Sequence, residues 1–250
     1  MIMELENISV VLFETIQAGN IGSAARAMKN MGLGRLKLVR PAQPINDECR
    51  RMAAGALDVV EAAKIYPSLD EALFDEHLVV GTTSHRDRSQ RQTLQSPRQL
   101  APLIRRQAQS HRVALLFGPE RAGLDDRTLS RCRHLVRIPT SSGHAVLNVA
   151  QSVMVLAYEI FSAQTEGPAS PPGLATDSQR EGMFEHVEKA LTRIGFFAAG
   201  NQEHLMKSIR NLLIPELTRR DVSIVRGIMS QLEWYAEEGH RILGTKTKRL

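Results

Sequence analysis

The segment QAGNIGSAARAMKNMG (residues 17–32) lies between two apolar runs, ISVVLF (8–13) and LKLV (36–39). From residue 21 to residue 31 its apolar side chains recur at helical spacing, and glycines at 32 and 34 end the pattern. A strand, a helix and a second strand within about thirty residues form a βαβ unit. This stretch therefore predicts parallel strands joined by a crossover helix.

The same alternation continues along the chain. Further apolar runs predict strands at 63–66, 77–83, 112–118 and 134–139. Helical patterns lie between them or follow them at 46–54, 68–74, 97–109, 126–131 and 147–163. Such alternation is typical of an α/β fold with a parallel sheet covered on both faces.

The composition changes after residue 164. Residues 165–178 (TEGPASPPGLATDS) hold three prolines and two glycines, which is typical of an extended linker. Only helical patterns follow, at 179–194, 201–213 and 219–238, and the basic end GTKTKRL is expected to be frayed. We therefore expect an α/β domain over 1–164, a linker over 165–178 and a small all-helical module over 179–250.

The composition also excludes several classes of protein. Aromatic residues make up only 4% of the chain, which argues against an aromatic stacking platform for single strands. Cys49 and Cys132 lie far apart and outside any Cys/His cluster, so no metal site is expected. No apolar run could span a bilayer, and the N-terminus lacks the basic region of a signal peptide. With two unpaired thiols, these features favour a soluble cytoplasmic protein without a membrane partner.

The charge distribution permits an anionic partner. The net charge is +5, and residues 84–112 contain seven arginines but one acidic residue, Asp87. This run begins after a predicted strand, at the edge where open α/β sheets bind ligands, and guanidinium groups match the geometry of phosphate. A solvated charged surface is the alternative explanation.

Two more loops follow predicted strands. In FGPERAGL (117–124) a tight turn carries Gly118 and Glu120, although a Glu–Arg pair at such a place can be an ordinary surface ion pair. In RIPTSSGHAVLNVA (137–150) a polar loop leads into a helix that begins near Asn148. His144 lies in this loop without a visible partner, and we do not expect it to be a general base.

Neither common phosphate-binding motif is present. The first segment lacks the Gly-Lys-Ser/Thr of a P-loop and the third glycine of a dinucleotide fingerprint. The second strand ends at Arg40 rather than at an acidic residue, which argues against a nicotinamide enzyme.

Three motifs taken in order, GNIGSAARA, FGPERAGL and IP followed by LNVA, resemble those of the SPOUT ribose methyltransferases. The chain looks most like the bacterial branch that methylates the ribose 2′-hydroxyl of nucleotide 32, the first nucleotide of the tRNA anticodon loop. The resemblance covers about 5–163, and the linker and helical module also look like that branch. It implies a parallel sheet with a C-terminal trefoil knot, a homodimer, S-adenosylmethionine as cofactor and tRNA rather than DNA as partner.

The resemblance also implies site residues. The cofactor would be held by Thr83, Ser84, His85, Gly118, Ile138, Ala145, Val146 and Leu147. The catalytic groups would be Asn20, Arg26, Glu120 and Asn148, and RNA would be bound by Arg86, Arg88 and Arg91. Gly19 and Gly22 would let the backbone approach RNA. Arg26 would clamp phosphate and stabilise developing negative charge, because a guanidinium does not act as a base.

One departure from the family concerns the third motif. The family usually has serine immediately before Leu-Asn, whereas this chain has Ala145 and Val146 there, with Ser141 and Ser142 upstream. This departure leaves open an RNA-binding relative with impaired catalysis. A ribosomal RNA substrate is a second open alternative, because the α/β domain does not decide between RNA substrates.

Overall fold

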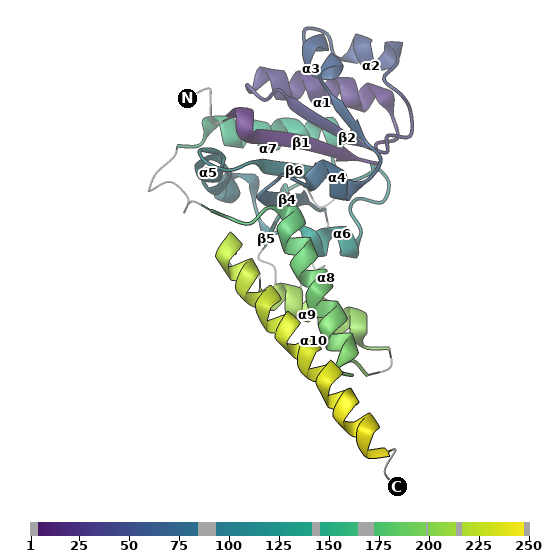
Figure 1. Cartoon of the computed structure of the whole chain (residues 1–250). Helices are drawn as coiled ribbons and strands as arrows, with labels where there is room; N and C mark the ends of the chain where they lie inside the picture. Colours follow the sequence, from purple (N-terminus) through teal and green to yellow (C-terminus); the bar gives the residue numbers. More distant parts are fainter. Residues whose placement is uncertain are drawn as a thin grey trace. The chain divides into compact units, whose positions relative to one another are not determined.

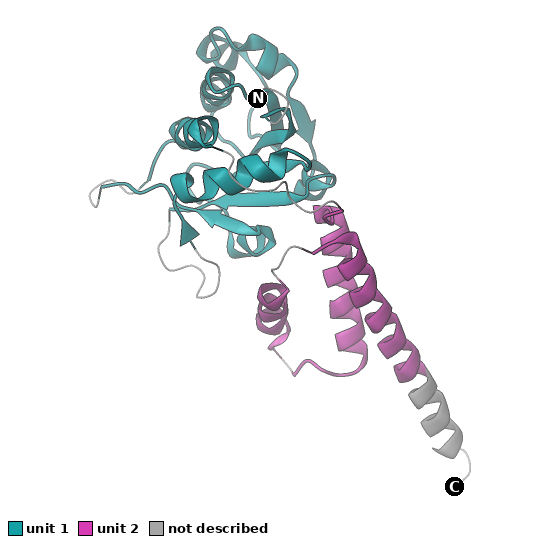
Figure 2. Ribbon diagram, turned by 90° about the vertical axis from the view of Figure 1, so that its left-hand side faces the viewer, with its two compact units in different colours: residues 1–172 teal, residues 173–250 magenta. Residues whose placement is uncertain are grey.

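The computed structural model describes residues 5–84, 94–141, 146–164, 173–198, 200–213 and 217–247. The chain divides into two compact units, residues 1–172 and residues 173–250 (Figure 2). The predicted His85, Arg86, Arg88, Arg91 and Ala145 lie outside the described residues.

The first unit is built on one parallel sheet, in the order β3-β2-β1-β6-β4-β7-β5 (Figure 1). Every paired strand is parallel to its neighbour. The strands are β1 (Ile8–Phe13), β2 (Arg35–Val39), β3 (Lys64–Tyr66), β4 (Leu78–Thr82), β5 (Leu94–Gln95), β6 (Val113–Phe117) and β7 (His134–Val136). Of these strands, only β5 was not expected from the sequence.

The helices of this unit connect the strands. They are α1 (Ala18–Asn30), α2 (Asp47–Met52), α3 (Leu57–Glu61), α4 (Leu69–Leu73), α5 (Pro97–Ala108), α6 (Asp126–Arg131) and α7 (Val149–Ser162), after a short 3-10 turn at Leu5–Asn7. Only α3 was not expected from the sequence. Among the described residues, no helix is both long and apolar enough to cross a membrane.

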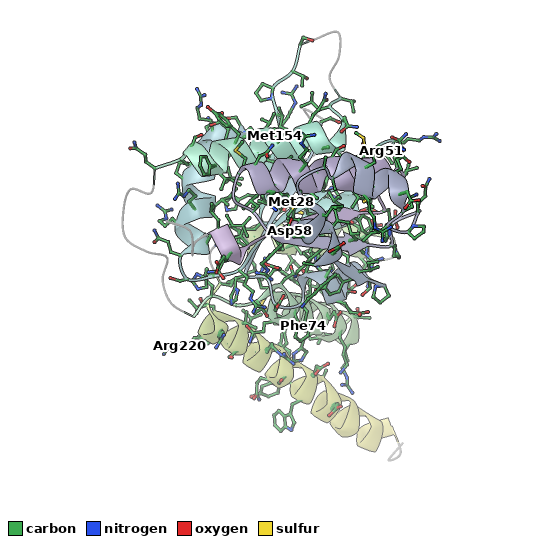
Figure 3. All side chains as sticks on the ribbon, turned by 90° about the horizontal axis from the view of Figure 1, so that it is seen from above. Met28, Arg51, Asp58, Phe74, Met154 and Arg220 are labelled. Carbon is green, nitrogen blue, oxygen red and sulfur yellow. The ribbon has the colours of Figure 1, made fainter. Side chains whose placement is uncertain are left out.

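Alternate residues of each strand pack on opposite faces of the sheet. Ile8, Val10 and Leu12 of β1 join a core with α1, α5 and α7, whereas Val11 faces a smaller core with α4 and α6. Met28 of α1 belongs to the larger core and Met154 of α7 packs against it; both are labelled in Figure 3. Since both faces of the sheet are covered, the central strands β1, β2, β4 and β6 are almost entirely buried, whereas β3 at one edge is largely exposed.

The glycine-containing segment differs from its prediction. Helix α1 begins at Ala18, earlier than the predicted start at residue 21, so Gly19 as well as Gly22 lies inside the helix. A Cβ on Gly22 would lie 2.0 Å from the Cys49 carbonyl oxygen of α2. Gly22 therefore lets α1 and α2 pack backbone to backbone, and the expectation that it serves a close approach of RNA is wrong.

The second unit contains α8 (Asp177–Arg193), α9 (Gln202–Leu212) and α10 (Arg219–Thr247). Its core gathers Met183, Phe184 and Val222. Arg210 donates to both carboxylate oxygens of Glu181 at 2.8 Å and lies over the Phe184 ring. Residues 244–250 were expected to be frayed. Helix α10 continues to Thr247, so this expectation is wrong for residues 244–247.

Candidate active site at the carboxyl edge of the sheet

A cavity of about 320 Å³ opens where β4, β6 and β7 end. Parallel strands present their carboxyl ends at one edge, so the loops that follow them meet there. The cavity is lined by Thr82, Thr83, Ser84, Phe117, Gly118, Pro119, Glu120, Arg121, Ala122, Gly123, Leu124, Val136, Ile138, Thr140, Val146, Leu147, Val149 and Ser152. Its size is in the usual range for a small-molecule site.

Most of the residues that were expected to hold a cofactor line this cavity. Thr83, Ser84, Gly118, Ile138, Val146 and Leu147 all line it. They come from three separate segments of the sequence, so only the fold brings them together. Glu120, predicted as a catalytic residue, lines it too. Other lining residues, such as Thr82, Leu124 and Val136, were not singled out from the sequence, and the available signal was their position in or near predicted strands.

Gly118 is required by the shape of the cavity wall. A Cβ at this position would lie 2.5 Å from the Gly123 carbonyl carbon and 2.5 Å from the Leu124 nitrogen. Both of these are backbone atoms, which cannot rotate away as a side chain can. The loop after β6 therefore folds back onto its own strand only because residue 118 has no side chain.

Glu120 fastens the loop after β6 to the loop after β1. Its carboxylate accepts hydrogen bonds from the backbone N–H of Ile16 at 2.9 Å and of Gln17 at 3.4 Å, and from Nδ2 of Asn20 at 2.7 Å. Burial of the carboxyl group opposes its ionisation, but the donors from Asn20 and Ile16 outweigh burial and lower the pKa of Glu120. A carboxylate held by three donors is a poor proton acceptor, so Glu120 is better suited to positioning than to general base catalysis.

Hydrogen bonds link Asn20 and Asn148 to this carboxylate. The Oδ1 atom of Asn20 accepts from Nδ2 of Asn148 at 2.8 Å, and Oδ1 of Asn148 accepts from the backbone N–H of Ala150 at 2.8 Å. An ionised carboxylate can only accept, so Glu120 fixes which way the Asn20 amide faces, and Asn20 then fixes Asn148. The three predicted residues form one chain of bonds ending at the first turn of α7.

Arg26 is placed differently from the other predicted catalytic residues. It is exposed and lies eight residues after the start of α1, about 12 Å along the helix axis from the sheet edge. No described residue forms a hydrogen bond or ion pair with it, and it does not line the cavity. Within one chain, therefore, the structure brings Asn20, Glu120 and Asn148 together but leaves Arg26 apart.

The arginine-rich run of residues 84–112 has several roles. Arg98 pairs with Glu159 of α7, and Arg105 donates to the carbonyl oxygens of Phe161 and Ala163 at the end of α7. Arg112 precedes β6 at the opposite, amino edge of the sheet and pairs with Asp75. These three arginines contact other groups of the same unit at different places, so the run as a whole is not a single surface for phosphate.

A second cavity of about 740 Å³ adjoins the first across the loop between β7 and α7. Ile138, Thr140 and Leu147 line both cavities, and Ser141 lines only the second. Ser141, one of the two serines upstream of the third motif, therefore lines the second cavity and not the one that contains Thr83, Ser84 and Gly118.

Comparison with known families identifies the class of protein. The model described as the SpoU rRNA Methylase family matches residues 7–158, and the model described as the tRNA methyltransferase TrmJ, C-terminal domain, matches residues 178–241. The chain belongs to the SpoU rRNA methylase family, which confirms the resemblance drawn from the three motifs.

Several relatives that match most of the chain are TrmJ proteins. The chain is 38% identical to the tRNA (cytidine/uridine-2′-O-)-methyltransferase TrmJ of Pectobacterium atrosepticum, over 92% of this chain and 98% of the relative. It is 36% identical to the tRNA (cytidine/uridine/adenosine-2′-O-)-methyltransferase TrmJ of Pseudomonas aeruginosa, over 92% and 95%. The crystal structure of TrmJ from Z. mobilis ZM4 superimposes with a TM-score of 0.80 and 33% identity, covering 90% of this chain and 98% of that one.

Proposed function

We propose that this protein transfers a methyl group from S-adenosylmethionine to a ribose 2′-hydroxyl of tRNA, at nucleotide 32 of the anticodon loop. The observation that carries the proposal is the cavity of about 320 Å³ at the carboxyl edge, beside the bonded group Asn20–Glu120–Asn148. The family and the TrmJ relatives supply the reaction and the class of RNA.

The chemistry of the cavity suits an adenosine-containing cofactor. Its lining combines apolar groups such as Ile138, Val146 and Leu147 with the hydroxyls of Thr83 and Ser84 and the exposed backbone around Gly118. The cofactor supplies an activated methyl group when it is bound. His85 and Ala145 are proposed to complete this site.

The residues of the chain would then orient the acceptor ribose. Asn20, Glu120 and Asn148 hold three loops in one arrangement, and orientation of two reactants can contribute about 7–11 kcal/mol to a reaction. Arg26 is proposed to bind the adjoining phosphate and stabilise charge on the 2′-oxygen as its proton leaves. Arg86, Arg88 and Arg91 are proposed to bind the RNA backbone.

Arg26 lies apart from the cavity of its own chain, which favours a homodimer in which each subunit supplies Arg26 to the other subunit's site. The surface of α7 supports the same assembly, since Tyr158 and Phe161 are about half exposed and Val146, just before the helix, is 67% exposed. Such apolar exposure beside a functional loop is characteristic of an interface. We therefore place Arg26 near the cavity of the partner subunit.

A mixed-dimer experiment tests this arrangement. Arg26→Ala and Gly118→Val subunits, each inactive alone, would be co-expressed with different tags. If Arg26 acts across the boundary, mixed dimers have one complete site, and random assortment restores about a quarter of wild-type activity. No recovery in mixed dimers that still bind the cofactor would show that Arg26 acts within its own chain.

The helical unit is proposed to bind tRNA, because its family model is specific to TrmJ. We retain the proposed domains 1–164 and 179–250 joined by 165–178. Deleting 165–250 is expected to raise the Kd for tRNA without changing the affinity for S-adenosylmethionine. An unchanged tRNA Kd would assign this unit another role, such as dimer support.

We also propose that the first unit carries the trefoil knot of its family and works in the cytoplasm. The strand order supports the knot, because the chain crosses from β5 at the sheet edge to β6 and then returns to β7 between β4 and β5. An experimental structure that traces residues 85–93 and 142–145 tests the threading.

Methyl transfer to defined transcripts tests the substrate. Unmodified tRNA should accept one methyl group from labelled S-adenosylmethionine, and a transcript with 2′-deoxyribose at nucleotide 32 should accept none. Equal labelling of both transcripts would place the reaction elsewhere. Labelling of ribosomal RNA but not tRNA would favour the alternative substrate.

A further inference from the structure

Two residues at the carboxyl edge have an unusual backbone conformation. Glu14, directly after β1, has φ of 53°, and Arg40, directly after β2, has φ of 46°. Among the described residues, no other non-glycine residue has positive φ. This left-handed conformation costs roughly 1–2 kcal/mol at each position, and glycine or asparagine would adopt it at lower cost.

The side chains of these two residues meet. The Arg40 guanidinium pairs with the Glu14 carboxylate and lies 5.3 Å from the centre of the Phe13 ring. The side chains stay 55% and 43% exposed. An exposed ion pair contributes about 0–1 kcal/mol and an exposed cation–π contact about 0.5–1 kcal/mol. These contacts only offset the strained backbone, so stability alone does not account for the arrangement.

The pair lies on the same edge as the candidate active site. The N–H of Glu14 donates to the carbonyl of Val39 at 2.8 Å, and the N–H of Ala42 donates to the carbonyl of Thr15 at 2.9 Å. The next residues along the chain, Ile16 and Gln17, donate to Glu120 in the cavity wall. A continuous set of bonds therefore connects the loop of Arg40 to the cavity.

We propose that Arg40 binds a phosphate group of the RNA substrate and that Glu14 is its positioning residue; this inference rests on the proposed function. A guanidinium has five N–H donors, and Glu14 accepts a single hydrogen bond from Arg40 in this structure. The remaining donors are available on a half-exposed group whose direction is already set by Glu14 and Phe13. A pre-positioned guanidinium loses less freedom on binding phosphate than a mobile one.

Arg40→Asn separates this role from a structural one. Asparagine tolerates the left-handed backbone, so the melting temperature should be unchanged or higher. Loss of one charge-assisted contact should raise the KM for tRNA about tenfold, with kcat at saturating tRNA and the affinity for S-adenosylmethionine unchanged. Arg40→Lys keeps the charge but loses the planar set of guanidinium donors, so its KM for tRNA should lie between those of the wild type and Arg40→Asn.

Arg112→Asn is the matched control, because Arg112 is also half exposed and paired with a carboxylate but lies at the amino edge. It makes the same change in charge and should leave the KM for tRNA unchanged. A wild-type KM in Arg40→Asn, or an equal rise in Arg112→Asn, would overturn the proposal. So would a lower melting temperature with parallel losses of kcat and cofactor affinity.

Direct tRNA binding by fluorescence anisotropy keeps the two proposals distinct. If the wild-type protein binds tRNA but does not methylate it, the proposed function fails, yet a weaker tRNA Kd in Arg40→Asn would still support the phosphate contact. If methylation occurs and Arg40→Asn binds tRNA as the wild type does, only the present inference fails.

Discussion

Gly118→Ala tests the cavity by adding one methyl group to its wall. The new Cβ would lie 2.5 Å from two backbone atoms of residues 123 and 124, whereas ordinary contact begins at 3.4 Å. The two segments must therefore separate by about 0.9 Å, and overpacking of this kind costs about 1–3 kcal/mol. Since a displacement of about 1 Å at a reactive site can cost about 100-fold in rate, methyl transfer should fall by that order.

Three measurements follow this variant. Calorimetric titration should show weaker binding of S-adenosylmethionine, a tritium-transfer assay should show the loss of rate, and thermal unfolding should show a modest decrease in stability. Gly34→Ala is the control, because no described atom outside its chain neighbours lies within 4 Å of its added Cβ. Wild-type cofactor affinity and rate in Gly118→Ala would refute the assignment of the cavity as the cofactor site.

Three more perturbations test the fold and the site. Gly22→Ala places a Cβ 2.0 Å from the Cys49 carbonyl oxygen and should lower the free energy of unfolding by at least about 1–3 kcal/mol in urea; an unchanged midpoint would contradict the close packing of α1 on α2. Glu76→Ala leaves Lys37, whose Nζ lies 2.7 Å from the Glu76 carboxylate, buried without that partner and should lower the free energy of unfolding by about 3–5 kcal/mol. The double variant Lys37→Met with Glu76→Leu should recover most of this loss. A Glu76→Ala protein as stable as the wild type would show that the pair is not buried. The pKa of Glu120 is lowered in the folded protein, so its stabilising contribution is present above the ordinary pKa of about 4.3 and is lost as pH falls through the folded-state pKa. Glu120→Gln should therefore remove that part of the loss of stability in acid. Identical dependence of stability on pH in the variant and the wild type would count against the bonded carboxylate.

The periodic part of the fold was predictable from sequence. Runs such as VALLF of β6 are apolar throughout, because central parallel strands are buried on both faces, and runs of mainly apolar residues marked six of the strands. Strand β5 was missed because Leu94–Gln95 is too short to show a period. Helix α3 was missed because it has only five residues, Leu57–Glu61, and no side-chain cap at its start.

The site was predictable in composition but not in geometry. Motif positions identified Gly118, Glu120 and Asn148, which lie after strand ends that the topology brings together. The packing role of Gly22 was not predicted, because a glycine allows a close approach of RNA and close helix packing equally well. The separation of Arg26 from the cavity could not be predicted, since it depends on the direction that α1 takes from the sheet edge.

Nucleotide-resolved mapping of ribose methylation in tRNA tests the central claim most directly. Total tRNA would be compared between a strain lacking this protein, the same strain carrying the wild-type gene, and the strain carrying Gly118→Val. We predict that 2′-O-methylation at nucleotide 32 disappears in the first strain, returns in the second and stays absent in the third. Unchanged methylation at nucleotide 32 in the deletion strain, with loss at another tRNA position or in ribosomal RNA, would contradict the account.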